Sequence, residues 1–233
     1  MKIALLGYGK MGKVIERIAL ERGHEIVLKK GSNDSFDGLE KADVAIDFSV
    51  PSSAVTNIST CFEMGIPVVS GTTGWLEDYN KMVALCEAKN GSFIYGSNFS
   101  LGVNVFFELN AYLAKMMANL KQYNVSMEEI HHTQKLDTPS GTAISLAEGI
   151  INNTEYNSWT METPKAEEIQ ITAKRIENIP GTHSIFYDSE VDQIEIKHTA
   201  HSREGFALGS VVAAEWLVGK KGIFTMKDVL GLK

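Results

Sequence analysis

The sequence of 233 residues has few cysteines, no long apolar run and no excess of positive charge, and each absence excludes a class of protein. The two cysteines, Cys61 and Cys86, form no CxxC pair, which is typical of a protein in a reducing compartment. Only four apolar residues separate Lys2 from Gly7, too few for a secretion signal, and no other run approaches the roughly 18 residues of a membrane span. We therefore expect a soluble, cytoplasmic protein with no membrane partner.

The formal net charge of −7 makes nucleic acid an improbable partner, because a polyanion would be repelled at long range. An anionic ligand would need a local site. The composition, with 44% hydrophobic and 22% charged residues and no low-complexity tract or repeat, indicates a globular chain with one large domain or two modest ones.

The first hundred residues alternate apolar, strand-like runs with amphipathic segments. We expect strands at 3–6, 26–28, 44–48, 67–69 and 93–95, a first helix that includes 14–19 and ends at Gly23, and further helices at 52–64 and 76–88. This βαβ series predicts an α/β fold, a Rossmann-type doubly wound parallel sheet.

A glycine-rich turn, Gly7-Tyr8-Gly9-Lys10-Met11-Gly12, joins the first strand to the first helix and fits the GxGxxG pattern. Gly7 permits a tight turn, Gly9 lets the backbone approach a pyrophosphate, and Gly12 lets helix and strand pack closely. The helix start also offers N–H groups to phosphates. In this strand–helix–strand context the pattern predicts dinucleotide binding rather than a structural turn.

Three polar loops follow later strands of the same series, at 47–51, 70–74 and 96–100. Ligands of open α/β sheets bind at the carboxyl ends of the strands, so we expect these loops to line the same crevice.

The second half of the chain has a different pattern. We expect a long helix at 104–119, an extended segment at 125–130, a helix at 144–151, strands at 169–172, 184–187 and 194–198, turns at Pro180-Gly181 and Asp188-Ser189, and a closing helix at 206–217. This predicts a dinucleotide-binding domain, 1–101 with 206–233, and an inserted, smaller α+β domain with a mixed sheet, 102–205, for substrate binding and oligomerisation.

A dense polar cluster at 129–143 precedes the helix at 144–151. We expect Thr138 to be its N-cap, because Pro139 favours the first helical position, with Ser140 as the alternative. Ser140, Gly141 and Thr142 would then lie in the first turn with backbone N–H groups available to an anion.

The same cluster contains two adjacent histidines, His131 and His132, and Lys135. Histidine can donate a proton near neutral pH, and lysine and a helix start can each bind a carboxylate. This suits a small dicarboxylate whose intermediate is protonated after hydride transfer, although a solvated polar loop is the plain alternative. We expect no metal, because no Cys/His/carboxylate set has the spacing of a known site; His198 and His201 alone have ligand-like spacing.

These segments resemble the 4-hydroxy-tetrahydrodipicolinate reductase (dihydrodipicolinate reductase) family over essentially the whole chain. The stretch Glu129-Ile-His-His-Thr-Gln-Lys-Leu-Asp-Thr-Pro-Ser-Gly-Thr-Ala143 fills every fixed position of the family's E-h-H-H-x-x-K-x-D-x-P-S-G-T-A signature. The loops at 47–49, 71–74 and 98–100 are also similar, as are Ser202-Arg203 and Phe206-Ala207.

The resemblance implies NAD(P)H-dependent reduction of 4-hydroxy-tetrahydrodipicolinate to tetrahydrodipicolinate, in the diaminopimelate pathway of lysine biosynthesis, by a homotetramer that assembles through the sheet of its second domain. It implies that His131 donates a proton and that Lys135 binds and helps to protonate the substrate. The residues implied to hold the carboxylates are His132, Ser140, Gly141, Thr142 and Arg203. Those implied to line the cofactor site are Gly7, Tyr8, Gly9, Lys10, Met11, Gly12, Phe48, Gly71, Thr72, Thr73, Ser97, Asn98, Phe99 and Ser100.

Two departures from the family concern the adenosine end of the cofactor: the glycine turn is one residue shorter than the longer family form, and the stretch between Leu28 and Val44 is abbreviated. The second strand runs into Lys29 and Lys30, with no carboxylate before Asp34. A carboxylate at the end of the second strand would favour NAD, because it accepts hydrogen bonds from the ribose hydroxyls. The ammonium groups of Lys29 and Lys30 should instead attract the 2′-phosphate of NADP. The alternative is that both lysines are simply solvated. We expect NADPH to serve at least as well as NADH.

Two other functions stay open: a Rossmann reductase of another imine or keto dicarboxylate, and a non-catalytic NAD(P)-sensing protein. Loss of His131 or Lys135 would favour the sensor, and both are present.

Overall fold

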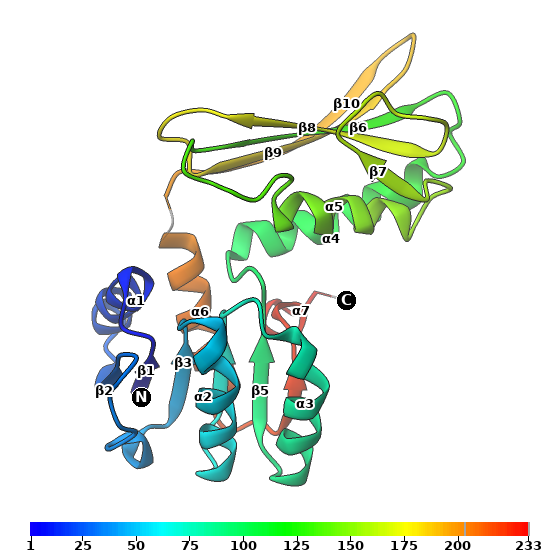
Figure 1. The fold of residues 1–233 in the computed structure, drawn as a ribbon. Helices are drawn as coiled ribbons and strands as arrows, with labels where there is room; N and C mark the ends of the chain where they lie inside the picture. The colour runs from blue at the N-terminus through cyan, green and yellow to red at the C-terminus, as the bar shows by residue number, and fades with distance from the viewer. Residues whose placement is uncertain (203, 233) are drawn as a thin grey trace. The chain divides into compact units, whose positions relative to one another are not determined.

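A computed structural model describes residues 1–202 and 204–232, which form two compact units (Figure 1). The first comprises Met1–Leu101 and Glu204–Lys233, and the second Gly102–Arg203. The second unit is therefore an insertion in the sequence of the first. Among the described residues, no helix is both long and apolar enough to cross a bilayer.

The first unit is built on a six-stranded sheet in which every neighbouring pair is parallel. The strands in spatial order are β11 (Gly222–Phe224), β5 (Ser92–Tyr95), β4 (Val68–Ser70), β3 (Val44–Asp47), β1 (Lys2–Leu6) and β2 (Glu25–Lys30). The chain runs outward from β1 to β2 and then crosses back to β3, so the winding reverses between β1 and β3. The doubly wound, Rossmann-like fold class is confirmed.

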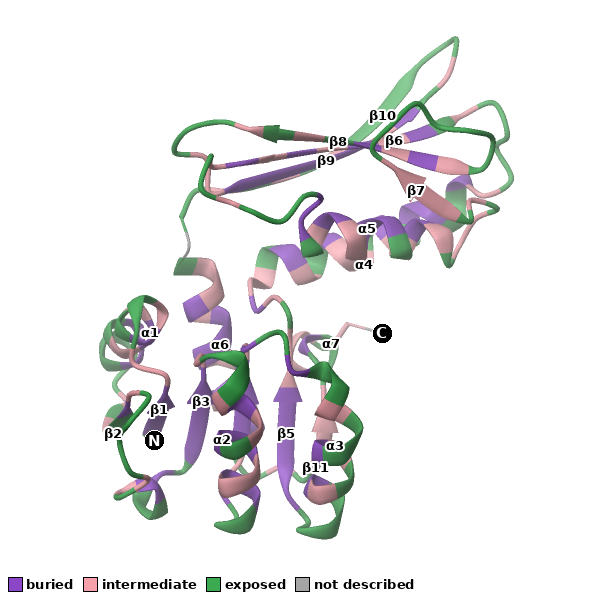
Figure 2. Ribbon diagram, viewed as in Figure 1, coloured by how far each residue is buried: buried purple, intermediate pink, exposed green. Residues whose placement is uncertain are grey.

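Helices cover both faces of this sheet (Figure 1): α1 (Lys10–Glu21) and α6 (Glu204–Leu217) one face, α2 (Pro51–Glu63) and α3 (Tyr79–Ala88) the other. Ile3 and Leu5 of β1 pack with α1 and α6, whereas Ala4 and Leu6 pack with α2 and α3. All four are at most 1% exposed, and this two-sided burial explains the continuous apolar run (Figure 2).

Some short elements were not expected from the sequence. They are β11, β7 (Ser158–Thr160), the helix α7 (Met226–Leu230) and the 3₁₀ turn η1 (Leu39–Lys41). Runs of three to five residues show too little periodicity to be recognised. The expected helix at 76–88 is divided into the 3₁₀ turn η2 (Leu76–Asp78) and α3, and the expected turn at Gly181 is instead the start of a strand.

The second unit is a mixed five-stranded sheet whose order is β10 (Gln193–Ala200), β9 (Gly181–Asp188), β6 (Asn124–His131), β8 (Glu168–Arg175) and β7. Strand β6 pairs in parallel with β8 and antiparallel with β9. Helices α4 (Leu101–Met117) and α5 (Gly141–Ile151) pack on one face (Figure 1).

Side chains alternate along β6, and this alternation positions the polar cluster. Val125 and Met127 point into the core beneath α4 and α5. Glu129 and His131 follow at the same period and are buried on the same face. An apolar core therefore passes directly into a buried polar site at the carboxyl end of β6.

Candidate active site

The glycine turn after β1 has three glycines with three different surroundings. Gly7 has φ +101°, which favours glycine, and a Cβ on Gly12 would lie 2.3 Å from the carbonyl oxygen of Gly7. A Cβ on Gly9 would meet nothing within 4 Å. Gly9 is also the N-cap of α1, and no side chain of the described residues caps the start of this helix. The backbone conformation and packing of the turn therefore explain why glycine is needed at positions 7 and 12. At position 9, glycine leaves open space beside the uncapped N–H groups of α1, as a bound phosphate requires.

A pocket of about 310 Å³ opens at this turn, between the ends of β1 and β3 where the winding of the sheet reverses. Its lining includes the predicted cofactor residues Gly7, Tyr8, Gly9, Lys30 and Phe48. The other lining residues were not predicted to bind the cofactor; they are Gly31, Ser32, Ser49, Val50, Ser53 and Asn57.

Other predicted cofactor residues adjoin the pocket or lie on loops of the first unit. A Cβ on Gly71 would lie 2.3 Å from the ring of Phe48, and Thr72 Oγ1 accepts a hydrogen bond from the Ser49 N–H at 2.8 Å. Lys10, Thr73 and Ser97 are exposed, and Asn98 Oδ1 accepts from the Ser100 N–H.

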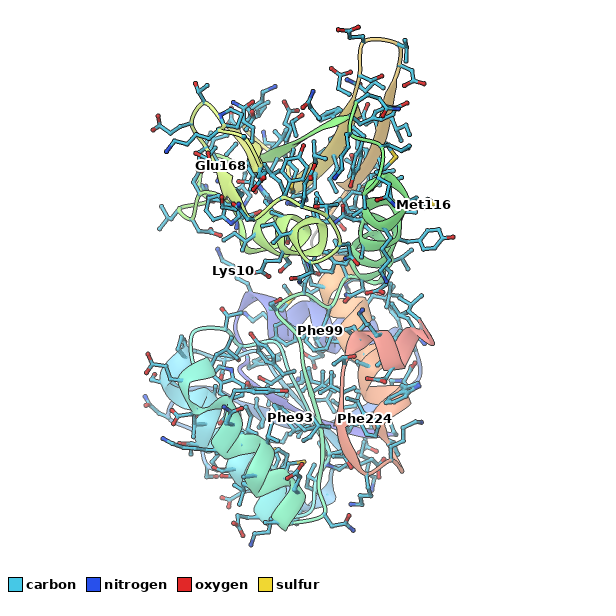
Figure 3. All side chains as sticks on the ribbon, turned by 90° about the vertical axis from the view of Figure 1, so that its right-hand side faces the viewer. Lys10, Phe93, Phe99, Met116, Glu168 and Phe224 are labelled. Atoms are coloured by element: carbon cyan, nitrogen blue, oxygen red, sulfur yellow. The ribbon has the colours of Figure 1, made fainter. Side chains whose placement is uncertain are left out.

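Three predicted cofactor residues face the core of the first unit instead. Phe99 is 1% exposed and lies inside the unit (Figure 3). Met11 packs against the same core, and Gly12 is buried under the turn. The ring of Phe99 therefore packs in the core, and a contribution of this residue to the cofactor site stays a prediction.

The two adjacent lysines at the end of β2 have opposite surroundings. Lys29 forms an ion pair with Glu16 at 2.5 Å, and Tyr8 donates to the same carboxylate. Lys30 is 7% exposed; its Nζ lies 4.7 Å from the centre of the Phe36 ring and donates to the Gly31 carbonyl at 3.2 Å. Lys30 therefore borders the pocket without a carboxylate partner among the described residues, whereas the charge of Lys29 is already engaged.

Asp47, at the end of β3, connects two of the polar loops, 47–51 and 70–74, with α2 and is missing from the sequence-based site. It is fully buried and accepts from Ser49 Oγ at 2.7 Å and from Asn57 Nδ2, Ser70 Oγ and Thr72 Oγ1 at 2.8 Å each. The sequence signal that could have identified Asp47 is an acidic residue at the end of a buried apolar strand. A carboxylate buried there needs hydrogen-bond donors nearby.

In the second unit, the cluster at the carboxyl end of β6 contains one buried carboxylate and two buried imidazoles. Glu129 Oε2 lies 3.4 Å from His131 Nδ1 and 3.8 Å from His183 Nε2. The two imidazole rings are edge to face, 5.0 Å apart, and His183 Nε2 lies 3.2 Å from Ser140 Oγ. Sequence analysis missed His183, which reaches the site from β9.

Burial controls the protonation of both histidines. It lowers the pKa of His131, and the carboxylate of Glu129 opposes that shift. Burial lowers the pKa of His183 to about 3, and the charges of His131, His198 and Lys135 add to this effect. His183 therefore stays neutral near pH 7, and His131 is the better proton donor of the two.

The segment that leads to α5 contains Lys135 and the helix start, both of which were predicted to bind substrate carboxylates. Lys135 pairs with Asp137, with both oxygens 2.9 Å from Nζ. The N-cap of α5 is Ser140, whose Oγ accepts from the Ala143 N–H, so the expected Thr138 N-cap is wrong. The Ser140 N–H is also not available to an anion, because it donates to both oxygens of Glu129 at 3.0 and 3.1 Å.

The remaining predicted substrate residues are dispersed. Gly141 is exposed, with open space where a Cβ would be, and Thr142 follows it in the first turn of α5. His132 lines a pocket of about 260 Å³ with residues 133–134 and 177–180. Arg203 lies outside the described residues.

Glu129, His131 and His183 each offer a ligand atom within 4.8 Å of the others, a spacing that could hold a metal ion. However, Arg175 Nη2 lies 3.1 Å from Glu129 Oε1, and the Ser140 N–H occupies both oxygens of the carboxylate. A guanidinium this close repels a cation, so the cluster is better suited to proton transfer.

A Rossmann-type unit with an open glycine turn, joined in one chain to a second unit that buries two histidines against a carboxylate, is typical of a two-domain, nicotinamide-dependent oxidoreductase. The family models named "Dihydrodipicolinate reductase, N-terminus" and "Dihydrodipicolinate reductase, C-terminus" match residues 1–99 and 102–230. A 4-hydroxy-tetrahydrodipicolinate reductase of Christiangramia forsetii is 59% identical over 99% of this chain and 98% of its own length. The chain belongs to the dihydrodipicolinate reductase family.

Solved structures agree on the fold. A dihydrodipicolinate reductase from Paenisporosarcina sp. TG-14 with dipicolinate bound has a TM-score of 0.78 at 21% identity, covering 97% of both chains. An engineered D-amino acid dehydrogenase bound to NADP⁺ has a TM-score of 0.53 at 13% identity, covering 100% of this chain and 96% of that one.

The glycines provide the first test. Gly12→Ala should destabilise the cofactor-free protein by about 3 kcal/mol, because its Cβ would collide with the Gly7 carbonyl. Gly9→Ala should leave the urea midpoint almost unchanged but weaken NADPH binding at least about tenfold, as one lost phosphate contact would. Fluorescence titration measures the binding, and normal binding by Gly9→Ala would contradict the phosphate site.

The second test is the pH dependence of stability. The unfolded chain takes up a proton on His183 below about pH 6.5, whereas the folded state resists it until about pH 3. The unfolded state therefore binds more protons between these values, and stability falls as the pH falls. At 1.36 kcal/mol per unit, wild type should lose about 2 kcal/mol more than His183→Gln between pH 7 and pH 5 in urea unfolding. Equal losses in the two proteins would show that His183 is not buried neutral.

Proposed function

We propose that this chain catalyses the NAD(P)H-dependent reduction of 4-hydroxy-tetrahydrodipicolinate to tetrahydrodipicolinate, in which the 4-hydroxyl group leaves as water, a step of the diaminopimelate route to lysine. The observation that carries this proposal is the placement of His131 against Glu129 at the end of β6, beside the start of α5, in a chain of this family. A proton donor beside a carboxylate-binding helix start is what reduction of a cyclic dicarboxylate imine requires.

A nicotinamide cofactor fits the first unit, because the start of α1 is uncapped and the space at Gly9 is open. When bound, it supplies the hydride. His131 donates the accompanying proton to the substrate, and Lys135 exchanges Asp137 for a substrate carboxylate. The start of α5, at Gly141 and Thr142, binds the second carboxylate, and His132 and Arg203 complete the substrate site.

We further propose a cytoplasmic homotetramer that assembles through the sheet of the second unit. Both cysteines are free and buried, which suits a reducing compartment. Helices α4 and α5 pack on one face of the sheet, and alternation places Ile130 and Phe186 on the opposite face, where both are half-buried.

The reaction is tested by adding freshly generated substrate and following nicotinamide absorbance. It should fall with wild type, and His131→Gln should lower kcat by about 10²–10⁴-fold at nearly constant KM, the usual worth of a general acid. Lys135→Ala should lower kcat/KM at least as far, because a charge partner of the substrate is lost. No absorbance change with folded wild type would contradict the proposal and favour an NAD(P)-sensing protein.

For the cofactor, we propose that NADPH serves at least as well as NADH and that Lys30 rather than Lys29 attracts the 2′-phosphate. Lys30→Ala should raise KM for NADPH about tenfold, the worth of one charge-assisted hydrogen bond, and leave KM for NADH nearly unchanged. Lys29→Ala is the matched control and should have little effect, since Glu16 engages its ammonium. The NADPH preference should shrink as salt is added.

A tenfold preference of wild type for NADH would overturn this assignment. Ribose recognition would then pass to Asp34, whose Oδ2 accepts from the Gly31 N–H at 2.7 Å beside the pocket.

A further inference from the structure

Glu129 is the most heavily engaged group of the second unit. It is fully buried, and both its oxygens accept the Ser140 N–H. Oε1 also accepts from Arg175 Nη2 at 3.1 Å, and Oε2 faces His131 Nδ1 at 3.4 Å. One carboxylate therefore contacts the start of α5, an arginine from β8 and the proposed proton donor.

Arg175 extends this connection to the segment that carries Lys135. Its Nη2 also donates to the Asp137 carbonyl at 2.7 Å and to Thr138 Oγ1 at 2.8 Å. Glu129 and Arg175 thus form a largely buried ion pair that fixes both ends of residues 137–140. Buried pairs contribute more to geometry than to stability, because desolvation offsets most of their attraction.

We propose that Glu129 is a positioning residue of the reduction site: it aligns His131 through Nδ1 and, by binding the Ser140 N–H, holds the start of α5 in place for a substrate carboxylate. The inference rests on the proposed function, in which His131 protonates the substrate. Glu129 is fully buried and its carboxylate accepts the Ser140 N–H, so its role is to position other groups rather than to contact the substrate.

The charge of Glu129 also matters for His131, because it opposes the lowering of the pKa of this imidazole by burial. Titratable and charged groups reach His131 from every neighbouring element. They are Glu129 on the same strand, Lys135 and Asp137 on the following loop, Arg175 on β8, and the neutral His183 on β9. Among these, Glu129 is the largest influence that favours the protonated form, ahead of Asp137, and Lys135 and Arg175 oppose it.

The test is Glu129→Gln, which keeps the shape and removes the charge. We expect the pKa of His131, followed by NMR and identified from the spectrum of His131→Gln, to fall by about 1–2 units, the usual effect of one nearby charge. The basic limb of the kcat profile should move to lower pH by the same amount, because the general acid loses its proton earlier. Affinity for NADPH should not change, since the cofactor turn lies in the other unit.

The matched control is Glu148→Gln, which removes one negative charge from an exposed position of α5. It should leave both the His131 pKa and the kcat profile in place. Arg175→Lys separates the charge of the ion pair from its geometry. The variant keeps a cation but loses the guanidinium hydrogen bonds to the Asp137 carbonyl and to Thr138 Oγ1. It should raise the substrate KM with only a small change in the His131 pKa.

An unchanged His131 pKa in folded Glu129→Gln would overturn the proposal. If that variant does not fold, Glu129→Asp replaces it, because it keeps the charge on a shorter side chain. The substrate KM of Glu129→Asp should rise while the pKa of His131 stays unchanged. An unchanged substrate KM would overturn the proposal. If wild type does not turn over the substrate, the proposed function fails, and the NMR titration still decides whether Glu129 controls His131.

Discussion

A carboxylate removed from water needs hydrogen-bond donors for most of its lone pairs, and each unit of this protein is organised around one such group. Asp47 gathers four side-chain donors from its own loop, from α2 and from the end of β4. Glu129 gathers the Ser140 N–H and Arg175, and it faces His131. Both acids are fully buried at or near the carboxyl end of a strand. The loops that contain the candidate binding residues converge there because the buried charges require their donors.

The two helix starts proposed to bind ligands are built differently, and the difference fits the size of the anion proposed for each. At α1 the N-cap is Gly9, and within the described part of the chain no side-chain capping hydrogen bond is formed there. At α5 the N-cap Ser140 bonds the Ala143 N–H, and Glu129 takes the Ser140 N–H. The first arrangement leaves a broad set of donors for a pyrophosphate, and the second leaves a narrower site that suits a single carboxylate.

Periodicity predicted every strand and helix longer than five residues, because burial on one or two faces leaves a regular pattern in the sequence. What it could not predict was proximity between distant residues. The Ser140 N–H was expected to be open to an anion, yet Glu129 binds it from β6. His183 enters the site from another strand, and no local pattern marks it. Lys29 and Lys30 are equivalent in sequence, but alternation along β2 sends them into different surroundings.

The uncapped start of α1 would also affect how readily proteases cut the chain there. Helix N–H groups without partners leave the first turn prone to local opening, and such openings are where proteases cut. A phosphate bound at Gly9 would close that turn, and a ligand present at a hundredfold excess over its Kd stabilises the folded state by about 2.7 kcal/mol. The rate at which proteases cut this turn would then fall as the cofactor is supplied.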